Sequence, residues 1–454
     1  MSVKFTEGGL SAPTRHNIEW KNKNFYDVDS INDELMRVFE ACHGCRRCVS
    51  LCDAFPTLFD LIDESKNFDL ESVDKKDYIK VVDECYLCDL CYQTKCPYVP
   101  PHEWAIDFPH LMLRAKAEKF KNQQSKLKIS MKLRNYILSS TDITFNFLSR
   151  PFIAGFTNVF LKIKSVRLII EKFLKIHRKA DLPSMNSYGI KKRFEKLNNF
   201  DGEIKDTPRT TGKVKLFATC YCTNSQPELA EDLLKVLIHN KITVDLFHQE
   251  SCCGMPKLEL GDLNSVEKLK QKNIPNLVKA INEGYDIISP IPSCVLMFKQ
   301  ELPLLFPEDN DVKLVQKHIF DPFEYLSIRD ESSLFNTDFK GSVGKVAYQT
   351  ACHQRVQNFG PKTKTILEKI PGTEVSMIER CSGHDGSYAI KLESFEKSLK
   401  IRKPVVSRIK KDNYKIFTSD CPMASKHIGN GLEKDNIKIE LHPISILKSA
   451  YKLN

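Results

Sequence analysis

Two cysteine runs dominate the first hundred residues of this chain. The run CHGCRRCVSLC spans residues 42–52, and the run CYLCDLCYQTKCP spans residues 85–97. In each run three cysteines are spaced by two residues, and a fourth follows after three or four more. One tight loop with this spacing can bring three thiolates to three corners of an iron–sulfur cubane. The runs therefore predict two [4Fe–4S] clusters bound by eight cysteines.

The fourth corner of each cluster needs a cysteine from elsewhere, and in two-cluster ferredoxins the other run supplies it. Asp53 replaces the usual proline after the first run, and the second run has one extra residue before its last cysteine. A pair of zinc sites is the alternative, but zinc commonly uses paired CxxC motifs, whereas here a third cysteine recurs at the same spacing. The expected ligand sets are Cys42, Cys45, Cys48 and Cys96 for one cluster, and Cys85, Cys88, Cys91 and Cys52 for the other.

Composition and length fit a soluble intracellular protein. The chain has 454 residues, of which 41% are hydrophobic and 28% charged, so two or three domains can each bury a core. Residues 1–32 lack the apolar core and cleavage site of a signal peptide. The sixteen cysteines are therefore expected to be reduced and mostly metal-bound rather than paired in disulfides.

Four regions follow from the distribution of cysteines and charge. We expect a helical two-cluster ferredoxin-like domain over residues 1–110, with helices near Ile31–Glu40 and Tyr78–Asp83 leading into the cysteine runs. A basic helical insert without cysteine covers 111–205, and two α/β lobes cover 206–330 and 331–454. The predicted fold class is thus α/β and α+β.

The last two regions repeat one pattern of strands and helices. Expected strands are Val214–Ala218, Ile242–Phe247, Tyr285–Pro290 and Val312–Val315, then Lys345–Gln349, Glu374–Ile378, Lys415–Thr418 and Lys438–Leu441. Expected helices between them include Glu228–His239, Val266–Asn282, Lys362–Ile370 and Ala389–Lys411. Such alternation predicts parallel βαβ units in each lobe.

The cysteines of the two lobes follow the same repeat. Cys220 matches Cys352, the sequence Cys-Cys-Gly at 252–254 matches Cys-Ser-Gly at 381–383, and Cys294 matches Cys421. Each cysteine comes near the end of an expected strand, where parallel sheets build their sites. Two related lobes that face one another are the expected arrangement.

This cysteine pattern resembles the cysteine-rich CCG domain, which occurs twice in the catalytic subunit of heterodisulfide reductase and in iron–sulfur subunits of glycolate and lactate oxidation. Ser251–Gly261, Pro292–Pro303 and Glu379–Asp385 are similar to the stretches around the cysteines of the anaerobic glycerol-3-phosphate dehydrogenase C subunit group. The resemblance extends over nearly the whole chain. It implies an electron-transfer subunit that takes electrons from a flavin-dependent dehydrogenase and passes them towards a quinone.

The lobes depart from that family in their cysteine count. The family's closing CxxC is absent after both lobes' last cysteine, and Ser382 stands in place of a paired cysteine. The resemblance therefore implies one or two further iron–sulfur clusters or zinc ions, with His353 or His384 as a candidate replacement ligand. Cys222 has no counterpart and is expected to be a spare thiol. His384 and Asp385 lie in a glycine-flanked turn at residues 383–386, which is either only a tight turn or has a functional role. The candidate ligands are Cys220, Cys252, Cys253 and Cys294 in the first lobe, and Cys352, Cys381 and Cys421 in the second.

The insert carries more positive charge than the chain's formal total of +10, so the rest of the chain is slightly acidic. Between Arg114 and Lys179 there are sixteen Lys and Arg residues against three acidic ones. Aromatic and aliphatic residues recur at helical spacing over residues 152–173, and the uncharged run 151–161 is too short to span a bilayer. A basic amphipathic helix is typical of the membrane interface, so residues 131–179 are expected to contact an anionic membrane surface. A core-packing helix with a basic solvent face is the alternative.

The sequence contains no Walker loop, no G-x-G-x-x-G after a strand and no nucleophile–base set, so no catalytic residue is predicted. Nucleic acid is not an expected partner because no reading motif accompanies the charge. The leading expectation is a cytoplasmic electron-transfer subunit, peripheral on the inner membrane face, whose donor dehydrogenase is of the glycerol-3-phosphate or 2-hydroxy-acid type. The alternatives are a reductase that acts on a disulfide or other small substrate at a lobe cluster, and a scaffold with zinc in its lobes.

Overall fold

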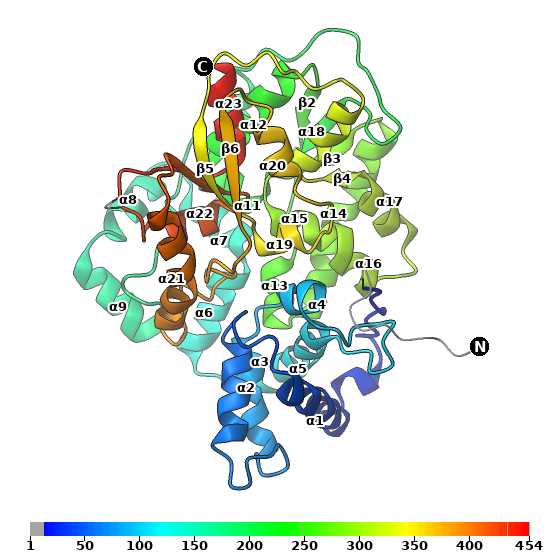
Figure 1. Cartoon of the computed structure of the whole chain (residues 1–454), viewed down its shortest axis with the longest axis vertical. Coiled ribbons are helices and arrows are strands. Elements are labelled where there is room, and N and C mark those ends of the chain that lie inside the picture. The colour runs from blue at the N-terminus through cyan, green and yellow to red at the C-terminus, as the bar shows by residue number, and fades with distance from the viewer. Residues whose placement is uncertain (1–12, 248, 434, 454) are drawn as a thin grey trace.

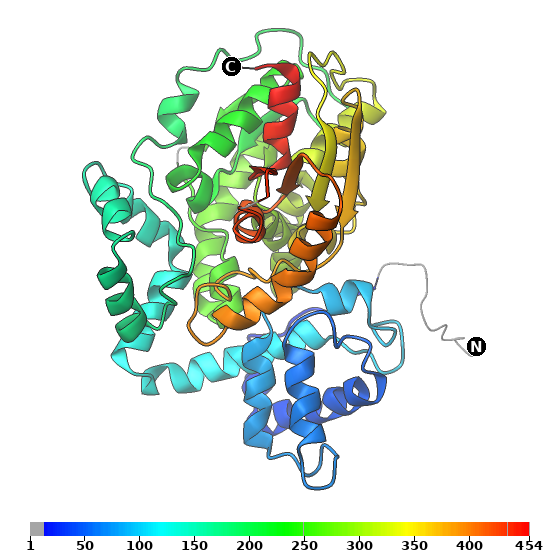
Figure 2. The same cartoon turned by 60° about the vertical axis from the view of Figure 1, so that its left-hand side comes forward.

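A computed structural model describes residues 13–247, 249–433 and 435–453. Figure 1 shows the N-terminal helices at one end of the molecule, the two α/β lobes at the other and the insert along one side. In the orientation of Figure 2 the insert stands out from the side of the lobes. The two lobes, named here by their sheets, hold strands β1–β4 and β5–β8 respectively.

The N-terminal part is helical and leads into each cysteine run with a helix, as the sequence predicted. Asp27 caps the first long helix by accepting the N–H of Ser30, and Asp107 caps the last by accepting that of His110. Its core is apolar and includes Phe39, Phe55 and Phe108. The elements are η1 (Lys23–Tyr26), α1 (Val28–Cys45), α2 (Ala54–Asp63), η2 (Lys75–Asp77), α3 (Tyr78–Glu84), α4 (Leu90–Thr94) and α5 (Phe108–Gln123).

The insert is a series of short helices that pack against the first lobe through α6 and α7. The expectation of one amphipathic helix over residues 152–173 is wrong in one respect. The backbone N–H groups of Lys162 and Ile163 bond to carbonyls three residues back, and Ile163 is extended, so a turn separates α8 from α9. The elements are η3 (Gln124–Lys126), α6 (Ile129–Ser139), α7 (Thr141–Leu148), α8 (Ile153–Phe160), α9 (Lys164–Leu174) and α10 (Ile190–Phe194).

The first lobe is a parallel sheet with the strand order β2-β1-β3-β4 and helices on both sides. Its elements are β1 (Lys213–Leu216), α11 (Thr219–Asn224), α12 (Pro227–His239), β2 (Thr243–Leu246), α13 (Met255–Leu260), α14 (Leu263–Asn282), β3 (Asp286–Ile288), α15 (Pro292–Leu296), η4 (Met297–Glu301), α16 (Leu302–Leu305), α17 (Asn310–His318), β4 (Ile319–Phe320) and α18 (Pro322–Glu331).

The second lobe repeats the topology with the order β6-β5-β7-β8, again all parallel. The two sheets have the same order of strands, which confirms the repeat predicted from sequence. The elements are β5 (Gly344–Gln349), α19 (Cys352–Arg355), α20 (Lys362–Leu367), β6 (Thr373–Ile378), α21 (Phe395–Lys411), β7 (Ile416–Ser419), α22 (Pro422–Gly429), β8 (Lys438–Glu440) and α23 (Pro443–Tyr451).

Two predicted elements of the lobes are wrong. Val312–Val315 is helical, because Asp309 accepts the N–H groups of Asp311 and Val312 and starts α17, and the fourth strand is β4 instead. The helix expected from Ala389 begins only at Phe395. The preceding segment pairs with the insert, where the N–H of Leu392 donates to the carbonyl of Lys175.

The lobes face each other through equivalent helices. The last helix of the second lobe, α23, packs on α12 of the first, and the last helix of the first lobe, α18, packs on α20 of the second. Ser445 donates a hydrogen bond of 2.7 Å to Asp232 across the first of these contacts. Because α12 corresponds to α20 and α18 to α23, the two contacts are related by an approximate two-fold symmetry.

Candidate metal centres

The N-terminal cysteines occupy loops whose backbone turns sharply. Cys42 and Cys45 lie at the end of α1, where Arg46 adopts a left-handed conformation with φ of 49°. In the second run Leu87 and Asp89 adopt φ of 54° and 60° on either side of Cys88. Left-handed residues are uncommon outside glycine, so these loops are held in shape by their surroundings.

The structure brings thiols of the two runs together, so that Cys42 has Cys96 as a neighbour and Cys52 has Cys85. Burial, reinforced by the neighbouring Cys96, raises the pKa of Cys42 and raises that of Cys48 to about 12. Burial and then the nearby Cys85 raise the pKa of Cys52. Cys45 is a neighbour of Cys42 and Cys48, and Cys88 and Cys91 are neighbours of Cys52. Thiols this close together and shielded from water are protonated unless a cation compensates their charge.

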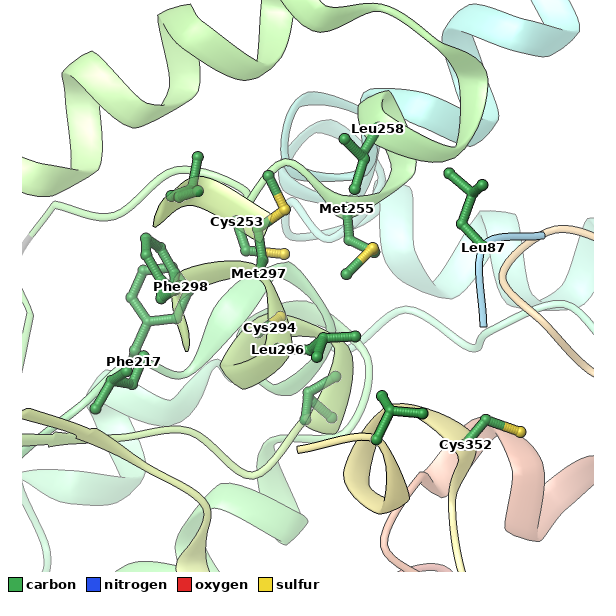
Figure 3. Close-up of a cluster of buried hydrophobic side chains, with 14 of the residues drawn as sticks. Leu87, Phe217, Cys253, Met255, Leu258, Cys294, Leu296, Met297, Phe298 and Cys352 are labelled. Carbon is green, nitrogen blue, oxygen red and sulfur yellow. The ribbon is translucent and has the colours of Figure 1, made fainter. Parts of the chain in front are cut away.

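In the first lobe four thiols form a chain at the end of the sheet. Cys220 lies on α11, Cys252 and Cys253 precede α13, and Cys294 lies on α15. Hydrogen bonds from the thiols of Cys220 and Cys253 lower the pKa of Cys252 and raise the pKa of its two donors. Figure 3 shows Cys253 and Cys294 among Met255, Met297 and other buried apolar side chains. One thiol of this chain is thus prepared to carry negative charge.

Thr141 of the insert completes the surroundings of the first-lobe thiols. Its Oγ1 lies 3.2 Å from Sγ of Cys220 and 3.7 Å from Sγ of Cys252. Cys222 shares α11 with Cys220 but is fully buried in the lobe's core. Nothing in the local sequence marked Thr141, because the insert and the lobe meet only in the folded chain.

In the second lobe a carboxylate joins the thiols. One ligand atom each of Cys352, Cys381 and Asp385 lies within 4.8 Å of the others. Sγ of Cys381 is 3.2 Å from Oδ2 of Asp385, and Cys421 lies close enough to interact electrostatically with Cys352 and Asp385. Sequence reasoning noted the turn that holds Asp385 but offered only histidines as replacement ligands.

The histidines lie differently. The ring of His384 packs edge-on against that of His427, with centroids 5.9 Å apart, and both rings line a large cavity. His353 interacts electrostatically with Asp385 and is partly buried. Asp385, rather than either histidine, is therefore the residue grouped with the second-lobe thiols.

The second-lobe thiols lie next to the N-terminal ones. A small cavity is lined by Cys52, Cys85, Cys88 and Cys91 together with Asp385 and Tyr388. After burial, Asp385 and Cys381 contribute most to the raised pKa of Cys88. Two interactions support this contact between the second lobe and the N-terminal part. Tyr388 donates a hydrogen bond of 2.6 Å to Glu84, and Lys397 forms an ion pair of 3.0 Å with Asp53. Two candidate centres thus adjoin each other across a boundary between distant parts of the chain.

A larger cavity of about 520 Å³ separates the candidate centre of the first lobe from the turn at 383–386. Apolar side chains of α6 and α7 form one wall, including Met131, Leu138 and Phe145. All four first-lobe cysteines line it as well. The volume is that of a site for a small organic molecule, and the apolar lining favours a ligand with a hydrophobic body.

Two of the ionisable groups that line this cavity have pKa values shifted towards neutrality. Burial raises the pKa of Glu259 to about 7, and burial with the nearby Arg134 lowers that of Lys391 to about 8. Arg134 is itself paired with Glu393 at 2.8 Å. The cavity therefore combines thiols, an apolar wall and two groups able to exchange protons near neutral pH.

All sixteen cysteines are free thiols, as expected from the sequence. The donor sets fit iron: two groups of four thiolates in the N-terminal part, four thiols in the first lobe, and three thiols with a carboxylate in the second. The chain's own residues thus present sulfur-rich sites suited to iron–sulfur clusters or zinc.

Comparison with known proteins gives two matches to one domain family. The cysteine-rich CCG domain matches residues 214–299 and again 346–427, which are the two lobes. The C subunit of the anaerobic glycerol-3-phosphate dehydrogenase of Escherichia coli K12 is 27% identical over 321 residues, which cover 70% of this chain and 77% of that protein.

Two further relatives share smaller parts. The B subunit of the CoM/CoB fumarate reductase of Methanothermobacter marburgensis is 28% identical over 55% of this chain and 49% of its own length. The lactate utilization protein A of Oceanobacillus iheyensis is 27% identical over 39% of this chain and 73% of its own length. The names of the dehydrogenase and reductase relatives describe subunits of redox enzymes.

Proposed function

We propose that this chain, a protein with two CCG cysteine-rich domains related to the C subunit of anaerobic glycerol-3-phosphate dehydrogenase, is an iron–sulfur electron-transfer subunit. It takes electrons from a partner flavin-dependent dehydrogenase, of the glycerol-3-phosphate or 2-hydroxy-acid type, and delivers them to a membrane quinone. The dehydrogenase and the quinone are proposed by analogy with the relatives and from the chemistry of the site. The chain itself contributes binding sites and spacing rather than a catalytic residue.

The observation that carries the proposal is the contact between the N-terminal thiols and the second lobe. Cys52 and Cys88 line the same small cavity as Asp385, which lies 3.2 Å from Cys381. Residues far apart in the chain thus bring two candidate metal sites side by side. Short separation between redox centres is what electron transfer needs, whereas a structural zinc site gains nothing from a neighbour.

The residues proposed to hold two [4Fe–4S] clusters are the two N-terminal groups, Cys42, Cys45, Cys48 and Cys96, and Cys85, Cys88, Cys91 and Cys52. When bound, such a cluster accepts and releases one electron at a time. The ferredoxin-like character of this part, and the number of further clusters in the lobes, belong to the proposal. Cys220, Cys252, Cys253 and Cys294 are proposed to hold a centre in the first lobe, and Cys352, Cys381 and Cys421 contribute to one in the second.

The quinone site is proposed to be the large cavity beside the first lobe. A quinone has an apolar body with two polar oxygens, and the cavity has an apolar wall with Glu259 and Lys391 at its border. Reduction to the quinol requires two electrons and two protons. The dehydrogenase supplies the electrons, and the two ionisable side chains can relay protons from solvent.

Attachment to a membrane surface is proposed for the insert. Phe152 is 95% exposed, and Phe156 and Phe173 are more than half exposed, so this face does not pack in the core. Lys164 and Lys172 of α9 are also exposed, and exposed basic and aromatic side chains together favour anionic lipid headgroups. No helix in the described ranges has both the length and the apolar character that crossing a bilayer requires. The proposed location is cytoplasmic and peripheral on the inner membrane face.

A second candidate function is reduction of a disulfide or another small substrate at a lobe cluster. It is favoured by the position of the first-lobe thiols in the lining of the large cavity and by the relative named as part of a CoM/CoB fumarate reductase. A scaffold with zinc in the lobes is a third candidate, for which stoichiometric zinc beside about eight irons would be diagnostic.

The test uses anaerobically purified full-length protein reduced with dithionite and mixed with a soluble naphthoquinone or a disulfide. Rapid reoxidation by the quinone alone supports the proposal, and reoxidation by the disulfide alone supports the second candidate. Leu138→Trp fills the cavity from α6 and is expected to slow quinone reoxidation at least about tenfold without loss of iron. Leu133→Trp on the same helix is the matched control, because Leu133 is exposed and outside the cavity. Equal rates in both variants would place the quinone elsewhere.

A further inference from the structure

The second lobe has one thiol fewer than the first. Ser382 occupies the position equivalent to Cys253, and its hydroxyl accepts the backbone N–H of His384 at 3.2 Å. The serine therefore stabilises the turn at residues 383–386 instead of offering a soft ligand. A fourth donor for this lobe has to come from another residue.

The turn is built to bring Asp385 back towards the thiols. Gly383 and Gly386 both have positive φ, of +76° and +53°, and Asp385 between them has φ of 27°. A Cβ at 383 would lie 2.4 Å from the carbonyl oxygen of Ser398, and one at 386 would lie 2.2 Å from Glu259. The backbone contact excludes a side chain at 383, whereas at 386 the positive φ favours glycine and a side chain would displace the Glu259 carboxylate.

The result is a carboxylate aimed at the thiols. Oδ2 of Asp385 lies 3.2 Å from Sγ of Cys381. A carboxylate oxygen of Asp385 and the Sγ atoms of Cys352 and Cys381 all lie within 4.8 Å of one another. Cys421 adjoins the same group. The carboxylate of Asp385 accepts a hydrogen bond from the thiol of Cys381 and interacts electrostatically with His353, and among the described residues no Lys or Arg forms an ion pair with it. A cation held by the group would compensate its negative charge.

We infer that Asp385 is the fourth ligand of the second-lobe metal centre, together with Cys352, Cys381 and Cys421. The inference rests on the proposed function, because it requires that this lobe bind an iron–sulfur centre. Carboxylate oxygen is a recognised ligand for metals that also bind thiolates. An oxygen-bound corner changes the potential and the spectrum of a centre otherwise held by sulfur.

The position of Asp385 adds a functional consequence. Asp385 lines the small cavity shared with Cys52 and Cys88, so the oxygen-bound corner faces the N-terminal thiols. The corner proposed to be bound by Asp385 therefore faces the N-terminal clusters, from which the second-lobe centre would receive electrons. The first lobe has no equivalent residue, since Gly254 is followed directly by α13. The two lobes of this chain are thus proposed to hold centres of different ligation.

The experiment compares Asp385→Ala, Asp385→Cys and Cys381→Ser in the full chain, purified without oxygen. Iron content, Mössbauer spectra and electron paramagnetic resonance are read out, none of which depends on turnover. We expect Asp385→Ala to lose about one iron atom per chain or the whole lobe centre. Asp385→Cys should retain all iron but lose the Mössbauer component of an oxygen-bound iron. Arg380→Ala is the control, because Arg380 is an exposed neighbour of Cys381, and it should leave iron content and spectra unchanged.

The outcomes separate this inference from the function on which it rests. If Cys381→Ser leaves the iron content unchanged, the second lobe holds no iron, and the ligand assignment falls with that part of the proposed function. If Cys381→Ser removes iron but Asp385→Ala and Asp385→Cys retain the spectrum of the unaltered protein, Asp385 is not a ligand while the centre stands. The Asp385→Cys variant guards against misfolding, since the new thiol keeps a ligand at the same place.

Discussion

The guanidinium of Arg15 donates hydrogen bonds to both carboxylate oxygens of Asp89, 74 residues away, at 2.6 and 2.9 Å. Asp89 stands inside the second cysteine run, between Cys88 and Cys91, and only 2% of its side chain is exposed. Arg15 also faces Asp107 at 3.2 Å and Glu301 of the first lobe at 3.6 Å. One buried cation thus joins the N-terminal segment, a cysteine loop and a lobe.

Removing this cation should destabilise the contact between the N-terminal part and the first lobe. Arg15→Ala removes the cation that pairs with Asp89 and leaves Asp107 and Glu301 with His110 alone. A buried charge that loses its partner costs about 3–5 kcal/mol. Denaturant unfolding under anaerobic conditions measures the loss. Lys21→Ala is the control, because the exposed pair of Lys21 with Glu267 is worth less than about 1 kcal/mol. Equal midpoints for the two variants would contradict the prediction.

A second prediction concerns pH and His110, which belongs to the same cluster. Its Nδ1 lies 3.1 Å from Asp107 and its Nε2 lies 3.5 Å from Glu301. Burial lowers the pKa of His110, and Arg15 also opposes its protonation, but the two carboxylates outweigh both and raise the pKa to about 9. Because this folded-state pKa exceeds the unfolded value near 6.5, the protonated histidine contributes stability that is complete below about pH 6.5 and lost as pH rises through 9.

The expected loss between about pH 6.5 and about pH 10 is roughly 3 kcal/mol from this group. The dependence of the free energy of unfolding on pH across that range should flatten in His110→Gln, because glutamine cannot carry the charge. His16→Gln, an exposed histidine in the same N-terminal segment, should keep the slope of the unaltered protein. A slope that survives in His110→Gln would show that other groups cause it.

Iron content tests the assignment of the N-terminal ligands. Cys88→Ser should lose one cluster, or about four irons per chain, together with its paramagnetic signal. Cys222→Ala is the matched control, since Cys222 is buried in the first lobe and is not among the proposed ligands. Full iron in the first variant, or a loss in the second, would require a different assignment.

Membrane attachment tests the role of the insert. The double variant Phe152→Ser with Phe156→Ser removes two exposed aromatic side chains, each worth about 1.5–3 kcal/mol when transferred from water. Sedimentation with vesicles containing anionic lipid should therefore weaken at least about tenfold. Phe68→Ser, which alters another exposed phenylalanine outside the insert, should bind as before. Undiminished sedimentation of the double variant would remove the insert from the membrane contact.

The local sequence pattern predicted most strands and helices of the lobes correctly. It failed where capping or packing by other residues determines the structure. Seven of the eight expected strands are strands, because alternating apolar residues bounded by turns have few other conformations. The segment Val312–Val315 was predicted to be a strand. Asp309 caps a helix there instead, and both valines are buried in that helix. The turn between α8 and α9 likewise leaves no mark in the helical spacing of the apolar residues.

By itself the sequence determined where the thiols are, how they are spaced and that the two lobes repeat, because these are properties of neighbouring residues and of residue order. Tertiary structure alone decided that Asp385 joins Cys352 and Cys381, that Thr141 meets Cys220, and that the N-terminal thiols adjoin the second lobe. Except for Asp385 and Cys381, which are four residues apart, these contacts join residues distant in the chain, and packing brings them together only after the helices and sheets have formed.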